Sequence, residues 1–341
     1  MVKSFRRIFA IVRLHRFRFI LSQFLIFIAA LATVGYATLI TPLVNQGMVA
    51  GDAEAALRIG LWMLLLALTM GVCMAIAASQ AVYFSQGAGY VVRSYLFEKI
   101  QSYSFENFDH LSTGDLMVRL NADAVNIQNA MQYGIMLGAY APFMLLAIFI
   151  LAIINTPNLV WVLVVVVAAV LLLMWWLLPA VDRAYKERQE RLDDLNHVLQ
   201  ENLTGISVVK AFIREDFEIE KFNQRAGALR IPALAAAWRV AFLSPLLTGV
   251  GQLAIMLTIR VGGTQVITGT GLTVGQVSSF TSYMSLIIMP LALMAIVVPL
   301  VLRGDVSASR ILEAYDAEPT VLDKEGAMTQ DLGNIKGHIA F

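Results

Sequence analysis

The sequence predicts an all-α membrane protein with six transmembrane helices, long cytoplasmic extensions of these helices, and short helices where the extensions turn. Of its 341 residues, 58% are hydrophobic and 14% are charged, whereas charged residues make up about 25% of an ordinary soluble domain. The charges are also confined to a few segments between long apolar windows. Because a helix needs about 20 apolar residues to cross about 30 Å of hydrocarbon, these windows are candidate spans.

The first two spans are expected in two uncharged windows near the N-terminus. Phe19–Gly51 carries no charge, and Pro42 and Gly47 predict where the first span leaves the membrane. Ile59–Val92 is also uncharged. A helix over this window is about 50 Å long at about 1.5 Å per residue. We therefore expect the second helix to continue well beyond the membrane.

The other four spans follow in three windows. Ala124–Val181 is too long for one crossing, and the turn sequence NTPN at Asn155–Asn158 divides it into a third and a fourth span. Val240–Ile259 predicts the fifth span and Val277–Leu302 the sixth. A glycine-rich loop over Gly262–Gly275 is expected between them.

The positions of Lys and Arg orient the spans. Six of these residues lie in the first 18 positions and ten lie between Asp182 and Arg239, whereas the opposite loops have only Arg58 and Arg260 near their edges. The positive-inside rule therefore places both termini in the cytoplasm, and we expect a multi-pass protein of the plasma (inner) membrane.

The N-terminal segment has two interpretations. The sequence FRRIFAIVRLHRFRF mixes Phe and Ile with arginines, which predicts a basic amphipathic helix at the membrane surface over residues 1–18. A cleaved signal peptide is the alternative. The apolar run that follows is longer than the about 7–15 residues of a signal core, which favours a retained span.

Two segments on the cytoplasmic side, residues 86–123 and 182–239, are much longer than the usual helix connection of about 2–8 residues. The second has an apolar stripe with helical spacing and two potential i,i+4 ion pairs. The stripe consists of Leu192, Leu195, Leu199, Leu203 and Ile206, and the pairs are Asp182/Lys186 and Glu187/Arg191. An apolar stripe in water needs a partner, so a bundle of long helical legs is favoured over a solvated hairpin.

Each of these legs contains a break. In the first, Thr113 or Asp115 is the expected N-cap of a short helix. In the second, the apolar run Ile206–Ala211 passes through Phe212 into the charged sequence Arg214–Asp216. Both patterns predict short helices at the tips of hairpins, where a cytosolic partner can bind the membrane domain.

The spans have no Asp, Glu, Lys or Arg in their central parts. The charged relay of many secondary transporters is therefore missing, and the energy for transport is expected from the cytosolic side. A sodium site at helices broken by proline remains an alternative. The single Cys73 excludes an internal disulfide, and the four histidines are widely separated, so no metal site is expected.

Three stretches in this order carry a resemblance: STGDLMVRLNADAVNIQ, VLQENLTGISVVKAFIREDFEIEKF and SASRILEAYDAEP. With six spans, the chain resembles the membrane half of an ABC exporter of the multidrug type over nearly all of its length. The resemblance implies an absent nucleotide-binding domain that binds ATP and Mg²⁺ and begins near Gly337–Phe341. The phosphate-loop pattern G-x-x-x-x-G-K-[ST] does not occur, so no catalytic residue is expected in this chain.

The resemblance divides the chain into the surface helix over 1–18, a six-span domain over 19–307, and a linker with the first residues of the absent domain over 308–341. It also implies a second half-transporter, either an identical copy or a related subunit. The hairpin tips would be coupling helices that dock on the nucleotide-binding domains. Coupling helix 1 would comprise Thr113, Gly114, Asp115, Leu116 and Arg119, and coupling helix 2 would comprise Lys210, Phe212, Arg214, Glu215 and Asp216.

Methionine and aromatic residues in the spans are candidates for a substrate cavity, because flexible and aromatic side chains suit apolar or cationic ligands. They are Met131, Tyr133, Met136, Tyr140, Phe280, Tyr283, Met284 and Met289. The alternative is that they simply pack helices or face lipid. The predicted function is ATP-driven export of hydrophobic or amphipathic compounds, drugs among them, with membrane lipid and no nucleic acid as further partner. A lipid flippase, a peptide exporter, an ion-coupled carrier and a membrane scaffold remain alternatives.

Overall fold

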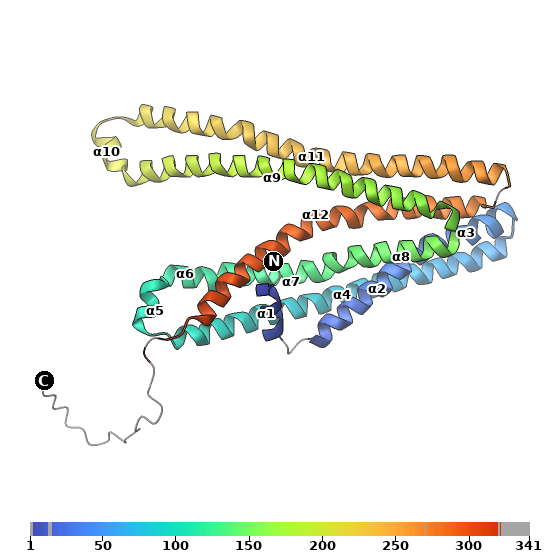
Figure 1. Cartoon of the computed structure of the whole chain (residues 1–341), viewed down its shortest axis with the longest axis horizontal. Coiled ribbons are helices and arrows are strands. Elements are labelled where there is room, and N and C mark those ends of the chain that lie inside the picture. Colours follow the sequence, from blue (N-terminus) through green and yellow to red (C-terminus); the bar gives the residue numbers. More distant parts are fainter. Residues whose placement is uncertain (1–2, 13–15, 270, 320, 322–341) are drawn as a thin grey trace, which may run out of the picture. The chain divides into compact units, whose positions relative to one another are not determined.

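The computed structural model describes residues 3–12, 16–269, 271–319 and 321, and the regular structure in these ranges is entirely helical (Figure 1). Six helical stretches among them are long and apolar enough to cross a membrane, which confirms the predicted number of spans. They are Arg16–Val49, Ala53–Gln101, Thr113–Asn155, Pro157–Thr204, Glu215–Ile267 and Val274–Asp316. The sequence from Gly337 to Phe341, where the absent domain was expected to begin, lies outside the described residues.

The helix of the first span does not end at Pro42. After α1 (Lys3–Ile11), α2 (Arg16–Thr38) and α3 (Ile40–Pro42), the chain continues in a wider π-helical turn, η2 (Leu43–Val49). Proline lacks an N–H group, but the next residue, Leu43, donates its N–H to the carbonyl of Leu39 at 3.1 Å. The helix therefore continues past the proline, and the point near Pro42 and Gly47 where the first span leaves the membrane stays a prediction.

The second span is the expected long helix, α4 (Ala53–Gln101), with 49 residues. At about 1.5 Å per residue it measures about 74 Å, more than twice the thickness of the hydrocarbon. Asp52 Oδ1 accepts a hydrogen bond from the backbone N–H of Ala55 at 2.9 Å and so satisfies one of the unpaired donors at the helix start.

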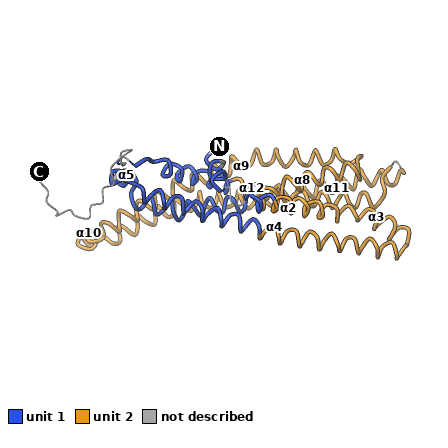
Figure 2. Tube along the Cα trace, turned by 90° about the horizontal axis from the view of Figure 1, so that it is seen from below, with its two compact units in different colours: residues 1–20, 80–134, 299–341 blue, residues 21–79, 135–298 orange. Residues whose placement is uncertain are grey.

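The chain forms two compact units (Figure 2). Unit 1 contains residues 1–20, 80–134 and 299–341, and unit 2 contains residues 21–79 and 135–298. Helix α4 and the last helix, α12 (Val274–Asp316), contribute residues to both.

Unit 1 contains the short helices that follow α4, including the first part of the third apolar stretch. They are α5 (Phe105–His110), α6 (Thr113–Val118), the π-helical η3 (Arg119–Asp123) and α7 (Ala124–Tyr133). Helix α7 comes very close to the later part of α12: a Cβ atom on Gly304 would lie 2.3 Å from the Cβ of Ala130. Only glycine fits at this contact.

Helix α1 is also part of unit 1. Its Ile8 is buried, and the ring of Phe9 packs against those of Phe19 and Phe84 with centroids 5.1 and 5.5 Å apart. Arg7 makes a double ion pair with Asp316 at the end of α12, with N–O distances of 2.5 and 2.7 Å. The N-terminal and C-terminal helical segments of unit 1 are thereby joined, whereas the interfacial location of residues 1–18 stays a prediction.

Unit 2 contains the rest of the third span and the fourth and fifth spans. After η4 (Gly134–Gly138) come α8 (Ala139–Asn155), the 3₁₀ turn η5 (Pro157–Leu159) and α9 (Val160–Thr204). Helices α10 (Ile206–Ala211) and α11 (Glu215–Ile267) complete a long hairpin. The turn expected at Asn155–Asn158 is confirmed, because α8 ends at Asn155 and Thr156 leaves the helical conformation with φ −140°.

The expected loop over Gly262–Gly275 is shorter than predicted, because α11 continues to Ile267 and α12 begins at Val274. Its outer glycines pack helices: a Cβ atom on Gly262 would lie 2.9 Å from Val277, and one on Gly275 would lie 2.3 Å from the carbonyl oxygen of Thr41. The chain instead turns near Gly271, which has a φ of +113°.

A polar cluster beside Gly275 ties the end of the first span to the start of the sixth within unit 2. The hydroxyls of Thr41 and Ser279 are 2.8 Å apart, and the Asn155 amide donates to both, at 3.0 and 3.2 Å. Asn45 Oδ1 accepts a hydrogen bond from the backbone N–H of Gly275 at 3.0 Å. The cluster satisfies polar groups that would be costly to leave unpaired in an apolar bundle.

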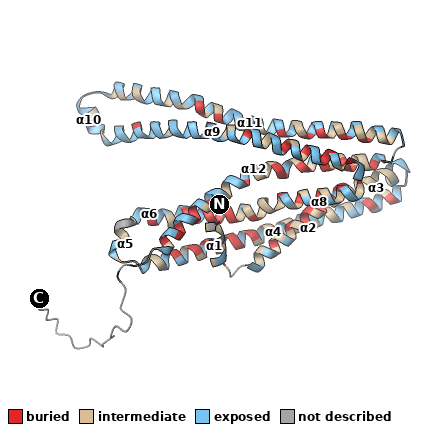
Figure 3. Ribbon diagram, in the orientation of Figure 1, coloured by how far each residue is buried: buried red, intermediate tan, exposed pale blue. Residues whose placement is uncertain are grey.

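The hairpin of α9 and α11 confirms that the apolar stripe has a helical partner, because α11 packs along α9. Exposed residues prevail at its α10 end, and buried ones become frequent farther along (Figure 3). Val198, next to the stripe residue Leu199, is buried, whereas Leu203 of the stripe is 69% exposed. This buried position on α9 thus lies beside the stripe that the sequence predicted.

Of the two expected ion pairs on α9, one is confirmed. Lys186 contacts Asp182 at 2.8 Å, but Arg191 contacts Asp194 at 3.4 Å instead of Glu187. Both ion pairs join neighbouring turns of the helix. The prediction considered only i,i+4 spacing and therefore missed Asp194, which lies at i,i+3 from Arg191.

Candidate functional site

The first hairpin tip is the short helix α6 in unit 1. Its N-cap is Ser112, whose hydroxyl oxygen accepts from the backbone N–H of Asp115 at 3.1 Å. The Ser112 hydroxyl also donates to Asp115 Oδ2 at 2.8 Å. The expectation that Thr113 or Asp115 is the cap was wrong, because Thr113 is already the first helical residue.

The residues predicted for coupling helix 1 have two different environments. Thr113, Gly114 and Asp115 are exposed, whereas Leu116 is buried. The Arg119 guanidinium, just after α6, donates to the backbone carbonyl of Arg310 at 2.7 Å and contacts Glu313 Oε2 at 3.1 Å. Leu116 and Arg119 therefore hold the tip in unit 1 and leave Thr113–Asp115 accessible.

Helix α5, directly before this tip, was missed at the sequence level. Asn107 donates from Nδ2 to the backbone carbonyl of Glu318 at 3.0 Å, and the Tyr103 hydroxyl donates to the backbone carbonyl of Ala314. Burial raises the pKa of Tyr103, and the nearby Arg119 opposes this rise. The signal in the sequence was Ser104 followed three residues later by Asn107, whose Oδ1 accepts from the backbone N–H of Ser104 at 2.9 Å.

The second hairpin tip is α10 in unit 2, and it matches the predicted helix Ile206–Ala211. Phe212 is 74% exposed and Ile213 is 83% exposed. Ile213 has a φ of +50°, in the left-handed region that a β-branched residue rarely adopts. Such a conformation costs about 1–3 kcal/mol and is characteristic of functional sites.

The charged residues predicted for coupling helix 2 flank these two apolar residues in the sequence. Lys210 Nζ contacts Glu215 Oε1 at 3.0 Å. A backbone hydrogen bond at the start of α11, together with Lys210, lowers the pKa of Glu215. Arg214 is the N-cap residue of α11, and Asp216 lies in its first turn, where the helix dipole favours a negative charge.

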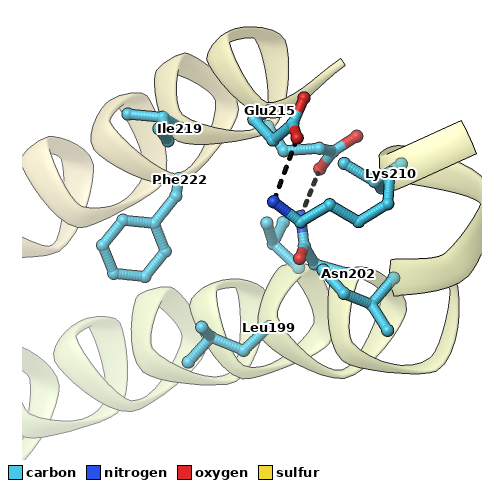
Figure 4. A pocket seen from close by; sticks show the side chains of 10 residues that line it. Leu199, Asn202, Lys210, Glu215, Ile219 and Phe222 are labelled. Carbon is cyan, nitrogen blue, oxygen red and sulfur yellow. Dashed lines mark hydrogen bonds and ion pairs between the residues drawn. The ribbon is translucent and has the colours of Figure 1, made fainter. Parts of the chain in front are cut away.

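A cavity of about 300 Å³ lies between α9, α10 and α11 behind this tip. Figure 4 shows Leu199 of α9 and Phe222 and Ile219 of α11 along its mainly apolar walls. Asn202 closes one side by donating from Nδ2 to Glu218 Oε2 at 3.0 Å (Figure 4). The tip is therefore supported by side chains with unfilled space between them, and it has fewer stabilising van der Waals contacts than a closely packed turn.

A second ion pair ties the two helices together near the tip. Lys221 Nζ of α11 lies 2.8 Å from Glu201 Oε2 of α9. The hydrogen bond from Lys221 lowers the pKa of Glu201, and the same bond raises the pKa of Lys221. Both groups are therefore charged at neutral pH.

The predicted cavity residues do not gather in one place. Phe280, Tyr283 and Met284 are fully buried in the helix-packing core of unit 2, and Tyr140 packs against that core. The remaining four are spread out: Met131 is buried and Tyr133 partly exposed in unit 1, while Met136 is half-buried and Met289 is 66% exposed in unit 2. A role for these eight in substrate binding stays a prediction.

A larger pocket in unit 2, of about 440 Å³, lies between α2, α4 and α12 and was missed at the sequence level. The apolar side chains of Leu66 and Met70 line it together with the hydroxyl-bearing residues Thr33, Ser282 and Ser285. Its α12 residues lie on a different face of that helix from the buried Phe280, Tyr283 and Met284. The only signal for it in the sequence was hydroxyl residues at helical spacing within apolar windows.

Comparison with known proteins agrees with this architecture. Residues 19–291 match the family model of the ABC transporter transmembrane region. The chain is 27% identical to the uncharacterized ABC transporter ATP-binding protein YfiB of Bacillus subtilis over 76% of the chain and 46% of that protein. It is 28% identical to an uncharacterized ABC transporter ATP-binding protein of Mycobacterium tuberculosis over 84% of the chain and 49% of that protein.

A third relative is the ATP-dependent lipid A-core flippase of Syntrophus aciditrophicus, 26% identical over 95% of the chain and 54% of that protein. The chain thus spans about half the length of the curated relatives it matches. The family model covers well over half of the chain and includes all or part of each of the six apolar helical stretches. The chain is therefore an integral membrane protein that belongs to the family of ABC transporter transmembrane regions.

Proposed function

We propose that this chain is the membrane-spanning subunit of a dimeric, ATP-driven exporter of hydrophobic or amphipathic compounds. The observation that carries the proposal is the second tip, where Phe212 and Ile213 project into solvent and Ile213 is held in a left-handed conformation. Exposed large apolar residues on a strained turn are expected where another protein docks.

In this proposal, α6 and α10 are coupling helices that dock on ATP-binding domains, which bind ATP and Mg²⁺. If each of the six apolar stretches crosses the membrane once, the turn after the second span and the turn after the fourth span would lie on the same side of the membrane as both termini. The Lys and Arg residues favour the cytoplasm for this side and thus a plasma membrane location. ATP-driven closure of the docked domains would move the long helices and alternate the access to the cargo site.

A lipid flippase is the second candidate function. It is favoured by the printed names of two relatives, the ATP-dependent lipid A-core flippases of Syntrophus aciditrophicus and Desulfotalea psychrophila. ATP-dependent movement of a labelled phospholipid between leaflets, in the absence of any export of apolar dyes, would favour it over a multidrug exporter.

The coupling role is tested in the full-length transporter reconstituted into liposomes, with ATP hydrolysis and dye transport measured together. Phe212→Ala at the second tip or Asp115→Ala at the first is expected to lower the transport per ATP hydrolysed while leaving membrane insertion intact. Truncation of an aromatic anchor at an interface costs about 2 kcal/mol or more, so docking should weaken at least about 30-fold for Phe212→Ala.

The matched control for the second tip is Ile231→Ala, which truncates an apolar side chain of α11 that is 75% exposed and lies outside the tip. It is expected to leave both activities unchanged. Unaltered coupling in both tip variants would contradict the proposed docking points.

A further inference from the structure

The pocket between α2, α4 and α12 has a chemical character that restricts its ligand. Its volume of about 440 Å³ is within the range of about 300–1,000 Å³ usual for small-molecule sites. No Asp, Glu, Lys, Arg or His is among its lining residues. Leu66 and Met70 of α4 supply apolar surface, whereas α2 and α12 supply the hydroxyls of Thr33, Ser282 and Ser285.

The protons of these three hydroxyls are already used. Each donates to the backbone carbonyl four residues earlier on its own helix, at 2.7 Å for Thr33, 3.2 Å for Ser282 and 3.1 Å for Ser285. A hydroxyl has one proton and two lone pairs. What these three hydroxyls still offer a ligand is therefore acceptor capacity, from two different helices, and Thr33 already has one further hydrogen bond, with Tyr140. Tyr36 also lines the pocket, and its hydroxyl can donate as well as accept.

A ligand that fits these walls carries a hydrogen-bond donor on an otherwise apolar body. Its donor can satisfy the lone pairs that Thr33, Ser282 and Ser285 present, and its apolar part can contact Leu66 and Met70. A full charge is disfavoured, because a buried ion without a charged partner is far more costly than a neutral polar group with a hydrogen bond.

We propose that this pocket is a cargo-binding site selective for uncharged amphipathic molecules that carry a hydroxyl or amide N–H donor. Thr33, Ser282 and Ser285 determine this selectivity by accepting the donor. The inference rests on the proposed export function, which it deepens by naming the class of cargo.

The test uses the full-length transporter in phosphatidylcholine nanodiscs and four probes with one pyrene body: 1-pyrenebutanol, its methyl ether, the carboxylate 1-pyrenebutanoate, and a pyrenebutyl trimethylammonium ion. Binding is measured by fluorescence anisotropy without nucleotide, and partitioning into lipid is subtracted with empty nanodiscs. The alcohol and the ether differ in the donor, so their ratio of affinities isolates the proposed hydrogen bond.

We expect the alcohol to bind about three- to tenfold more tightly than the ether, the range for one neutral hydrogen bond in an apolar site. Both ions are expected to bind more weakly than the alcohol. The double variant Ser282→Ala and Ser285→Ala should reduce the preference for the alcohol, and adding Thr33→Val should abolish it.

The control variant is Thr69→Val, which changes a threonine of α4 that also donates to the carbonyl four residues earlier, at 2.8 Å, but does not line the pocket. It should keep the preference for the alcohol. Equal binding of alcohol and ether, tighter binding of either ion, or a preference that survives the triple variant would overturn the inference.

ATP-driven transport is measured on the same preparation to separate the two proposals. Transport without selectivity for the alcohol contradicts the cargo class alone. Selective binding without any ATP-driven transport supports the pocket as a site for molecules with a hydrogen-bond donor, but it contradicts the proposed export function.

Discussion

Ile213 is the residue that carries backbone strain in the candidate coupling tip. Its φ of +50° places a β-branched side chain in a conformation that glycine adopts without strain. Its side chain is 83% exposed, so burial within this chain does not repay the strain. A functional contact made by the side chain would explain why isoleucine occupies this position.

Ile213→Gly should therefore stabilise the tip while weakening coupling. Relief of the left-handed strain is worth about 1–2 kcal/mol, less the about 0.5–1 kcal/mol that glycine costs in the unfolded chain. Hydrogen–deuterium exchange of the α10 amides should slow, whereas transport per ATP should fall. As a control, Ile219→Gly should speed exchange of the α11 amides near residue 219, because glycine has a lower helix propensity than isoleucine. Faster exchange in Ile213→Gly would refute the strain argument.

At the scale of elements, glycine determines how closely the first and sixth spans approach. A Cβ atom on Gly275 would lie 2.3 Å from the carbonyl oxygen of Thr41, next to the Asn155 hydrogen bonds. Gly275→Ala should therefore separate the helix ends and cost about 1–3 kcal/mol, as expected for overpacking. Thermal unfolding in detergent checks this. Gly263→Ala is the matched control on α11, because nothing lies within 4 Å of its added Cβ. It should leave stability unchanged or raise it by about 0.5–1 kcal/mol.

The hairpin of α9 and α11 should depend on pH through Glu201 and Lys221. Because the pKa of Glu201 is lowered, its contribution to the stability of the hairpin is present above the ordinary pKa of 4.5. This contribution is lost as pH falls through the lowered pKa. Because the pKa of Lys221 is raised, its contribution to the stability of the hairpin is present below the ordinary pKa of 10.5. This contribution is lost as pH rises through the raised pKa. Limited proteolysis of the hairpin should show a protected plateau between these limits.

Glu201→Gln should abolish the increase in cleavage at acidic pH, which we call the acid limb. Cleavage of this variant should then stay constant as pH falls through the lowered pKa of Glu201. The matched control is Glu187→Gln on α9, whose expected partner, Arg191, contacts Asp194 instead. An unchanged acid limb in Glu201→Gln would show that other groups control the hairpin.

At the scale of the whole molecule, the sequence was sufficient for the number of spans and for both short tip helices, because charge is costly inside a membrane and apolar windows are therefore unambiguous. The continuation of the helices past Pro42 and Gly262 was not predictable by the same reasoning. Proline and glycine usually break helices, but here the Leu43 N–H restores the helix and Gly262 permits close packing.

The predicted cavity residues show a second limit of sequence reasoning. In an apolar span, residue type does not reveal which face meets a neighbouring helix, so Phe280 and Met284 could not be distinguished from pocket residues. Ser282 and Ser285 line the pocket, yet each looks like an ordinary serine that bonds to its own helix backbone. Only the arrangement of α2, α4 and α12 shows that both serines line one pocket.

The energy source is a property of the whole molecule, and it separates an ATP-driven exporter from an ion-coupled carrier. The central parts of the spans have no Asp, Glu, Lys or Arg to bind or relay an ion. In liposomes that contain the full-length transporter, we therefore expect export of 1-pyrenebutanol with ATP and Mg²⁺ and none under a proton or sodium gradient alone. Replacing ATP with a non-hydrolysable analogue should stop turnover, and an ionophore should leave ATP-driven export unchanged. Export under a sodium gradient without nucleotide would instead indicate a cation site made by backbone carbonyls of the proline-containing helices α8, α9, α11 and α12, because proline frees carbonyl oxygens within the spans.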